Sequence, residues 1–330
     1  MNKIDLSFID ESSPRNLVAT EYILPSLLAW HRMGLRYAII TLVNIVGSSP
    51  RALGSLMAVS SEGHSVGYLS GGCLERAIII EAQRCIEQGR NRLIRYGKGS
   101  PYFDIQLPCG SGVDVYIDQG VEISLLTRLD ELSRNRKAVI QSTDLETGAN
   151  TFAIVNTANE RSRLDGRVFR RVIWPAVRVY LVGAGPAVPA IAHLLSAVGF
   201  PAEVVSPDEA TRAEVRAFGL ASSALTNATI GALEGDPWTA AILAFHEHRW
   251  ELSLIEQLLT SDCFYIGVLG SKAVAETRVA ELRRRGVGPE KLGRIRAPVG
   301  LIAGTKSRLS LAVSVISELV GEAKAREFVA

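Results

Sequence analysis

The stretch VRVYLVGAGPAV at residues 177–188 decides the fold of the second half of this 330-residue chain. Six mostly apolar residues lead into the G-x-G of Gly183 and Gly185, and a helical stretch follows. A doubly wound parallel sheet typically begins with a buried strand, a glycine-containing turn and a helix, in that order. Similar apolar runs, typical of strands buried on both faces, lie at 202–205, 240–245 and 263–269. We therefore predict a Rossmann-like domain that extends to the C-terminus.

The glycines of this stretch form an incomplete dinucleotide-binding fingerprint. Val188 stands where a third glycine normally allows close packing of the helix. Asp208 follows the strand at 202–205 at about the distance where an acid would bind an adenine ribose, but a turn residue after proline explains it equally well. The pattern leaves open a nucleotide such as NAD(P) at Gly183 and Gly185. The alternative function is accordingly an NAD(P)-dependent oxidoreductase.

Two histidines, His246 and His248, follow the strand at 240–245. They belong to the carboxyl edge of the parallel sheet, where α/β folds bind ligands. Histidines at i and i+2 can bind a metal, yet no third ligand follows at a diagnostic spacing. Ordinary loop residues satisfied by water or backbone are the competing explanation.

The chain before this sheet is predicted to be a smaller, mixed α+β domain. Trp174-Pro175 marks the linker, which gives an N-terminal domain at 1–172 and a C-terminal domain at 173–330. Strand-like runs rich in Ile, Val and Thr lie at 37–46, 55–60 and 65–69, and helical patterns at 25–34 and 74–88. Cys85 falls on the apolar face of the second helix and should fill the core. Residues 120–175 are predicted to form strands and loops with charged turns.

Composition limits the class of partner. Hydrophobic residues make up 47% and charged residues 21%, as in an ordinary globular α/β protein. The formal net charge of +2 gives no field that would favour nucleic acid or a membrane surface. No apolar run approaches the ~20 residues that span a bilayer, and no signal-peptide core follows Met1. We expect a cytoplasmic protein whose four scattered cysteines are free thiols.

Three segments of the first half combine glycines with polar or reactive side chains. They are GSSPRALG at 47–54, LSGGCLE at 69–75 and LPCGSG at 107–112. Each glycine alone is more often a turn residue than a ligand contact. The conjunction of two cysteines, Cys73 and Cys109, with Arg51 favours one composite site.

In the second segment, Gly71 and Gly72 end a strand, and a helix is predicted to start near Cys73. Free backbone N–H groups and the positive end of the helix dipole would then meet at the thiol. Such a position binds anions and lowers a thiol's pKa. Glu75 is equally well explained as a ligand and as a residue that stabilises the helix start.

The other two segments offer complementary groups. Arg51, in a glycine-bounded loop beside Ser48, can clamp a phosphate oxygen through two hydrogen bonds, unless it is a surface arginine with a solvated head. Gly110 allows the backbone at Cys109 to approach a bulky ligand, or it serves a tight turn into the next strand.

The three segments, in this order, resemble the hallmark segments of the XdhC/CoxI family, and the second half resembles that family's C-terminal Rossmann-type domain. Ser111 stands where many relatives have glycine, and Pro186 where relatives commonly have histidine. By this resemblance, 1–172 is the cofactor-binding domain. The residues implied in cofactor binding are Ser48, Arg51, Gly71, Gly72, Cys73, Glu75, Cys109, Gly110, Gly183, Gly185, His246 and His248.

The resemblance implies a maturation factor rather than an enzyme. Such a protein binds molybdenum cofactor (molybdopterin), protects it while a cysteine desulfurase installs its terminal sulfur, and inserts it into an apo molybdenum hydroxylase such as xanthine dehydrogenase or aldehyde oxidoreductase. Three roles are open to Cys73 and Cys109: ligation of molybdenum, sulfur transfer, or lining the pocket. A homodimer is compatible with the sequence. A structural component of the target enzyme is a third functional hypothesis.

Overall fold

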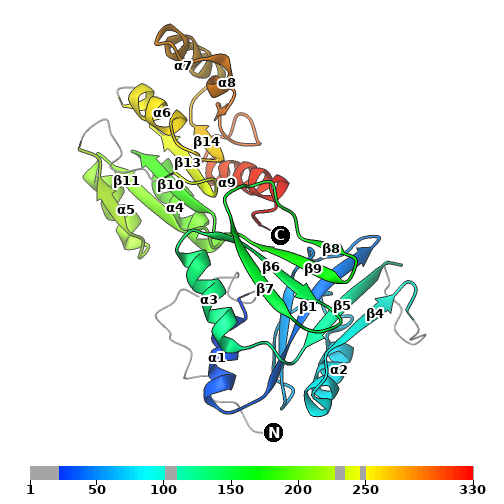
Figure 1. Ribbon diagram of the computed structural model, residues 1–330. Helices are drawn as coiled ribbons and strands as arrows, with labels where there is room; N and C mark the ends of the chain where they lie inside the picture. The colour runs from blue at the N-terminus through cyan, green and yellow to red at the C-terminus, as the bar shows by residue number, and fades with distance from the viewer. Residues whose placement is uncertain (1–21, 101–109, 227–234, 246–249, 330) are drawn as a thin grey trace.

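The computed structural model describes residues 22–100, 110–226, 235–245 and 250–329. In this part of the chain it contains three β-sheets, of five, four and six strands. Figure 1 shows the first two sheets in its lower half and the six-stranded sheet in its upper half. The mixed α/β architecture with a parallel C-terminal sheet confirms the predicted fold class.

The first sheet is antiparallel and has the strand order β3-β2-β1-β5-β4. Its elements are α1 (Leu24–Arg32), β1 (Tyr37–Val46), β2 (Leu56–Ser60), β3 (Ser65–Gly67), α2 (Glu75–Gln88), β4 (Arg92–Gly97) and β5 (Gly112–Asp118). Helix α2 packs its apolar face, with Ile78, Ala82 and Cys85, into the core of this sheet. The predicted strands, the helix and the core position of Cys85 are confirmed.

The strand register brings distant loops to one end of this sheet. Val46, the last residue of β1, pairs with Gly112, the first residue of β5. Gly67, which ends β3, pairs with Met57 near the start of β2. Because neighbouring strands are antiparallel, the chain leaves β1 and β3 and enters β2 and β5 at the same end. Residues 47–55, 68–74 and 110–111, which follow β1, follow β3 and precede β5, therefore lie at the same end of this sheet.

The second sheet has the order β7-β6-β9-β8 and is also antiparallel. It is formed by β6 (Ala138–Asp144), β7 (Asn150–Val155), β8 (Arg163–Asp165) and β9 (Val168–Ile173). The prediction of only strands and loops at 120–175 is wrong, because helix α3 spans Ile123–Arg134. Leu125, Leu129 and Leu132 recur at helical spacing and pack against Val139 and Ile173.

The third sheet is parallel, with the order β12-β11-β10-β13-β14-β15. Its elements are β10 (Arg178–Gly183), α4 (Ala187–Ala197), β11 (Ala202–Ser206), α5 (Glu209–Ala217), β12 (Ser222–Ala224), β13 (Thr239–Ala244), α6 (Glu251–Leu259), β14 (Tyr265–Val268), α7 (Lys272–Arg284), α8 (Pro289–Leu292), β15 (Ile295–Arg296) and α9 (Arg308–Ala325). The alternation of strand and helix from residue 178 onward confirms the doubly wound sheet.

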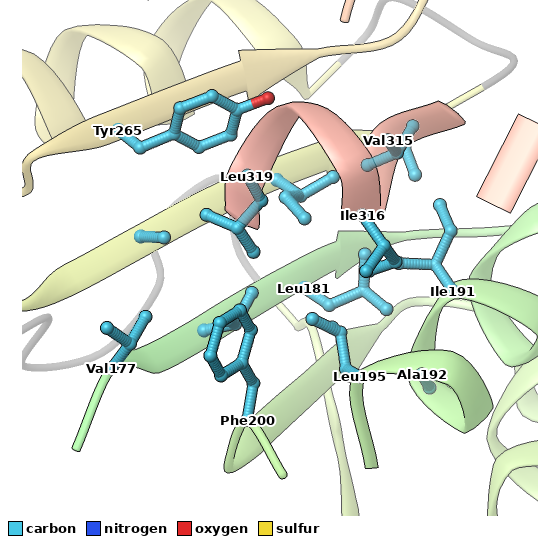
Figure 2. Close-up of a cluster of buried hydrophobic side chains, with 14 of the residues drawn as sticks. Val177, Leu181, Ile191, Ala192, Leu195, Phe200, Tyr265, Val315, Ile316 and Leu319 are labelled. Carbon is cyan, nitrogen blue, oxygen red and sulfur yellow. The ribbon is translucent and has the colours of Figure 1, made fainter. Parts of the chain in front are cut away.

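The largest core lies between this parallel sheet and helices α4 and α9. Figure 2 shows Leu181 of β10 facing Ile191 and Leu195 of α4, with Ile316 and Leu319 of α9 close by. Burial of these side chains contributes roughly 1.5–3 kcal/mol each. No helix in the described ranges is long and apolar enough to cross a bilayer.

The end of the chain returns to the N-terminal half. Phe328, just beyond α9, packs edge-on against Trp174 at a centroid distance of 5.4 Å, and Trp174 in turn contacts Trp238 at 5.8 Å. Arg136, between α3 and β6, makes a two-pronged ion pair with Asp236 at 2.6 and 2.7 Å. Figure 1 marks the C-terminus beside α9 and above β8 and β9. These contacts, which we call the seam, join the parallel sheet to the preceding sheets.

Candidate functional site

The loops at the shared end of the five-stranded sheet touch each other. A Cβ built on Gly47, which has φ +90°, would lie 3.3 Å from Cβ of Ser111. The segment after β1 and the segment before β5 are thus in van der Waals contact. This closeness explains a glycine at position 47, since a side chain there would press on Ser111 and would also need a left-handed backbone.

Arg51 links the first of these loops to the segment before α2. Its guanidinium carbon lies 4.5 Å from the ring centroid of Tyr68, and Nη1 donates a 3.4 Å hydrogen bond to the Tyr68 hydroxyl. Only 8% of Arg51 is exposed. The alternative that Arg51 is a surface arginine with a solvated head is therefore wrong. A cation stacked on an aromatic ring is held in place, and Tyr68 immediately precedes the LSGGCLE segment.

Glu75 organises that segment. Its carboxylate accepts hydrogen bonds from the backbone N–H groups of Leu69, Ser70 and Gly72 at 2.8–3.0 Å and from the Ser70 hydroxyl at 2.6 Å. Burial opposes ionisation, but the hydrogen bonds from Ser70 and Leu69 outweigh it and lower the pKa of Glu75 to about 2. The prediction of free amides for an incoming anion is thus corrected at these three positions, because the protein's own carboxylate occupies them.

Cys73 lies at the tip of this segment and is exposed. Helix α2 starts at Glu75 with Leu74 as its N-cap, so the thiol precedes the first helical turn. Gly71 and Gly72 have φ of +77° and +115°, and a Cβ on either would meet no atom of the described residues within 4 Å. The tight turn and the open space around it leave the thiol accessible to a bulky ligand.

The remaining predicted residues of this end are placed as follows. Ser48 and Gly110 are exposed in the two loops that meet at Gly47 and Ser111. Cys109 lies outside the described residues, so the pairing of its thiol with Cys73 stays a prediction. No cluster of three potential metal ligands occurs in the part of the chain that the structure describes.

Arg51 also lines a cavity of about 390 Å³. Its lining comes from the loop after β1, from β9 and from the end of the chain: Arg51, Ala52, Leu53, Gly54, Ser55, Leu56, Ser162, Arg171, Val172, Trp174, Lys324, Glu327, Phe328 and Val329. Arg171 was not among the predicted site residues, and neither was Tyr68. Nothing local in the sequence signals either one, because each becomes a neighbour of Arg51 or its loop only through folding.

At the parallel sheet, the predicted glycines have structural tasks. A Cβ on Gly183 would lie 2.0 Å from the carbonyl oxygen of Ala244, so this glycine allows β10 and β13 to pack. The N–H of Gly185 donates to the Thr211 hydroxyl at 2.9 Å. Asp208, considered above as a ribose ligand, caps helix α5 by accepting from the Thr211 N–H at 2.8 Å.

These contacts tie the glycine turn to α5. In a dinucleotide-binding turn, the N–H of Gly185 would face the pyrophosphate. Here it donates to the Thr211 side chain instead. His246 and His248 lie outside the described residues, so their role stays a prediction.

Comparison with known proteins agrees with the fold. Residues 179–319 match the family model described as the XdhC Rossmann domain, and residues 30–97 match that of the XdhC and CoxI family. Over 305 residues the chain is 32% identical to the Escherichia coli (strain K12) protein named molybdenum cofactor insertion chaperone PaoD, and the match covers 88% of this chain and 87% of PaoD.

Two further relatives span most of the chain. A Bacillus subtilis (strain 168) protein, named as a probable subunit of xanthine dehydrogenase, is 24% identical over 308 residues, or 85% of this chain and 91% of that one. A crystal structure described as that of a xanthine dehydrogenase from Bacillus halodurans has a TM-score of 0.72 at 22% identity and covers 93% of this chain and 96% of its own. The last similarity shows the shared fold. The two family models and the 32% identity along most of both sequences show that this chain belongs to the XdhC/CoxI family.

Proposed function

We propose that this protein is a molybdenum cofactor carrier. It holds the cofactor at the shared end of the five-stranded sheet and shields it while a cysteine desulfurase supplies the terminal sulfur. It then inserts the cofactor into an apo molybdenum hydroxylase of the xanthine dehydrogenase or aldehyde oxidoreductase type. The name of the 32% identical relative, a molybdenum cofactor insertion chaperone, supports this assignment.

One observation carries the proposal. The three glycine-bounded segments end at one end of one sheet, where the buried cation Arg51 contacts Tyr68 and the exposed thiol of Cys73 follows five residues later. Molybdenum cofactor is a cargo with an anionic phosphate and a soft, sulfur-rich metal centre. A fixed cation suits the phosphate, and thiolates are ligands for soft metals. The residues present therefore fit the cargo.

The proposed roles differ along the site. Arg51 binds an anionic oxygen, and Ser48 donates a hydrogen bond from the rim. Gly71, Gly72 and Gly110 allow the backbone to approach the pterin. Glu75 acts indirectly, since it holds the turn that presents Cys73.

Cys73 and Cys109 are the proposed contacts to molybdenum or to its sulfur ligand. His246, His248, Gly183 and Gly185 remain proposed contributors from the second domain. The part of the two glycines is secondary, because the N–H of Gly185 donates to the Thr211 hydroxyl.

Two other functions make different predictions. An NAD(P)-dependent oxidoreductase would need the turn at Gly185 to receive the dinucleotide, and its N–H is bonded to Thr211. A structural role within the hydroxylase is suggested by the name of the Bacillus subtilis relative, a probable xanthine dehydrogenase component. Such a component would co-purify with the mature hydroxylase at fixed stoichiometry, whereas a carrier would leave it after insertion.

The test is to purify the full chain from molybdenum-replete cells and to measure molybdenum and pterin per chain. We expect both to be retained, and Cys73→Ala to retain several-fold less. Ser65→Ala is the matched control, because Ser65 is also small and exposed but begins β3 at the opposite end of the sheet. Full retention by Cys73→Ala would remove the thiol from the mechanism.

A second measurement distinguishes a cofactor carrier from an NAD(P)-dependent oxidoreductase. Calorimetric titration with NAD and NADP is expected to show no binding. Binding accompanied by turnover of a substrate would replace the carrier with an oxidoreductase.

A further inference from the structure

The cavity next to Arg51 is strongly cationic. Arg51, Arg171 and Lys324 line it, and Glu327 is the acid among the described lining residues. Glu327 is already paired, since its carboxylate lies 3.2 Å from Nε of Arg161, which is not a lining residue. The charge of Glu327 is thereby balanced from outside. A lining with three cations and a neutralised acid favours an anion inside the cavity.

Arg171 is a cation of this cavity that lacks a carboxylate partner among the described residues. Its Nε donates to the backbone carbonyl of Gly54 at 2.9 Å, and no described carboxylate forms an ion pair with it. Burial lowers the pKa of Arg171 to about 10, so the guanidinium remains charged at neutral pH. A partly buried charge without an acid partner is costly, and an anionic ligand reduces that cost.

The geometry also specifies how an anion would be held. The Nε–Gly54 bond fixes the plane of the Arg171 guanidinium and leaves its terminal nitrogens as donors. The Ser162 hydroxyl accepts from the N–H of Val172 at 3.0 Å, which leaves its proton to donate. Lys324 approaches from the last turn of α9, and Trp174 and Phe328 add an apolar wall.

We infer that this cavity is a binding site for the phosphate group of an organic phosphate, held by Arg171, Ser162 and Lys324 together with Arg51. A phosphate dianion matches the forked donors of arginine and several positive charges at once, whereas one carboxylate would balance only one of them. The apolar wall favours a phosphate that carries an organic body over the free ion. Since Arg51 also contacts Tyr68, the cavity continues the site at Cys73.

The assignment of this phosphate to the cargo rests on the proposed function, since the cofactor carries one. The pterin would then extend from the cavity towards Cys73, with Arg51 between phosphate and metal centre. The cavity volume of about 390 Å³ lies within the range of small-molecule sites. The site is also assembled from both halves of the chain, because Arg171 belongs to β9 and Lys324 to α9.

The first test is calorimetric titration of the full chain with inorganic phosphate and pyrophosphate at constant ionic strength, with chloride as the reference anion. We expect Arg171→Leu to weaken phosphate binding about ten- to a hundredfold, since it removes charge-assisted hydrogen bonds. The matched control is Arg170→Leu, which removes the same charge from the adjacent position of β9, outside the cavity.

Lys324→Gln is the second variant, because Lys324 is exposed and its loss does not threaten folding. We expect it to weaken phosphate binding several-fold. Phosphate binding no tighter than chloride, or equal affinity in wild type, Arg171→Leu and Lys324→Gln, would overturn the site.

A second arm identifies the source of the phosphate. Pterin per chain is measured for wild type, Lys324→Gln and Arg170→Leu purified from molybdenum-replete cells. If only Lys324→Gln retains less pterin, the result supports the phosphate of the cofactor as the occupant of the cavity. Equal retention in all three, with phosphate affinity reduced in Lys324→Gln, overturns that assignment and leaves the carrier function standing. Phosphate binding by a wild-type chain that retains no pterin supports the site while the carrier function fails.

Discussion

Glu75 shows how one residue decides what a glycine turn can bind. Its position at the start of α2 is suited to stabilise the helix, and its carboxylate also closes the turn by bonding to Leu69, Ser70 and Gly72. An external anion would have to displace this carboxylate. In the proposed site, the positive charge for an anionic cargo comes instead from the side chains of Arg51 and Arg171, on other elements.

Replacement of this carboxylate should change the pH dependence of stability. The pKa of Glu75 is lowered from 4.5 to about 2 in the folded protein. A group with a depressed folded pKa stabilises the fold above its unfolded pKa, and this contribution is lost as the pH falls towards the folded pKa. At pH 7, we expect Glu75→Gln to lower the free energy of unfolding by about 1–2 kcal/mol.

The difference should shrink between about pH 4.5 and pH 2, as followed by urea denaturation. Glu87→Gln is the matched control, because Glu87 is exposed on the same helix. A deficit in Glu75→Gln that is constant over this pH range would contradict the assigned pKa.

Among the elements, the turn between β10 and α4 is built for packing. Gly183 allows the strand β10 to lie against Ala244 of β13, and Val188 in α4 is fully buried in the core below. The third glycine of a dinucleotide fingerprint is therefore replaced by a core residue. This element explains why a G-x-G in the sequence does not by itself predict a nucleotide site.

A methyl group at Gly183 should be costly. Its Cβ would lie 2.0 Å from the Ala244 carbonyl oxygen, and backbone atoms cannot move aside easily. We expect Gly183→Ala to lower the free energy of unfolding by about 2–3 kcal/mol, measured by chemical denaturation. Gly321→Ala is the control, since Gly321 lies in α9 with open space around it. Gly321→Ala should raise the free energy of unfolding by about 0.5–1 kcal/mol. Equal destabilisation by Gly183→Ala and Gly321→Ala would rule out the packing explanation.

On the scale of the whole molecule, the seam holds the two halves together. We propose that the halves are domains, 1–172 and 173–330, as the sequence predicts. Trp174 at the boundary is covered by Phe328 from the other end of the chain, and Arg136 reaches Asp236 across the boundary. The phosphate cavity lies along the same line of contact, so ligand binding and domain packing should support each other.

Removal of Phe328 should loosen this seam. We expect Phe328→Ala to lower the free energy of unfolding by about 3 kcal/mol and to speed proteolytic cleavage at 174–177. Phe218→Ala is the matched control, because Phe218 is 47% exposed on the outer side of the second half. Cleavage products are identified by mass spectrometry. Equal cleavage rates in the two variants would show that Phe328 does not hold the seam.

The fold class and most helices and strands follow from the amino-acid sequence alone. Strands such as β1 and β10 were predicted almost to the residue, because their apolar runs have no other stable environment than a buried sheet. The order of the three glycine-bounded segments was enough to place the chain in its family. Helix α3 was not predicted, although Leu125, Leu129 and Leu132 recur at helical spacing and could have revealed it.

The surroundings of the candidate site depend on contacts that form only when the chain folds. Tyr68 and Arg171 lie 17 and 120 positions from Arg51 in the sequence, yet folding brings Tyr68 against Arg51 and places Arg171 in the same cavity lining. Local patterns report burial and backbone conformation, which depend on near neighbours in the chain. Contacts between side chains far apart in sequence depend on strand register and domain packing, and a single sequence does not encode these in any local signal.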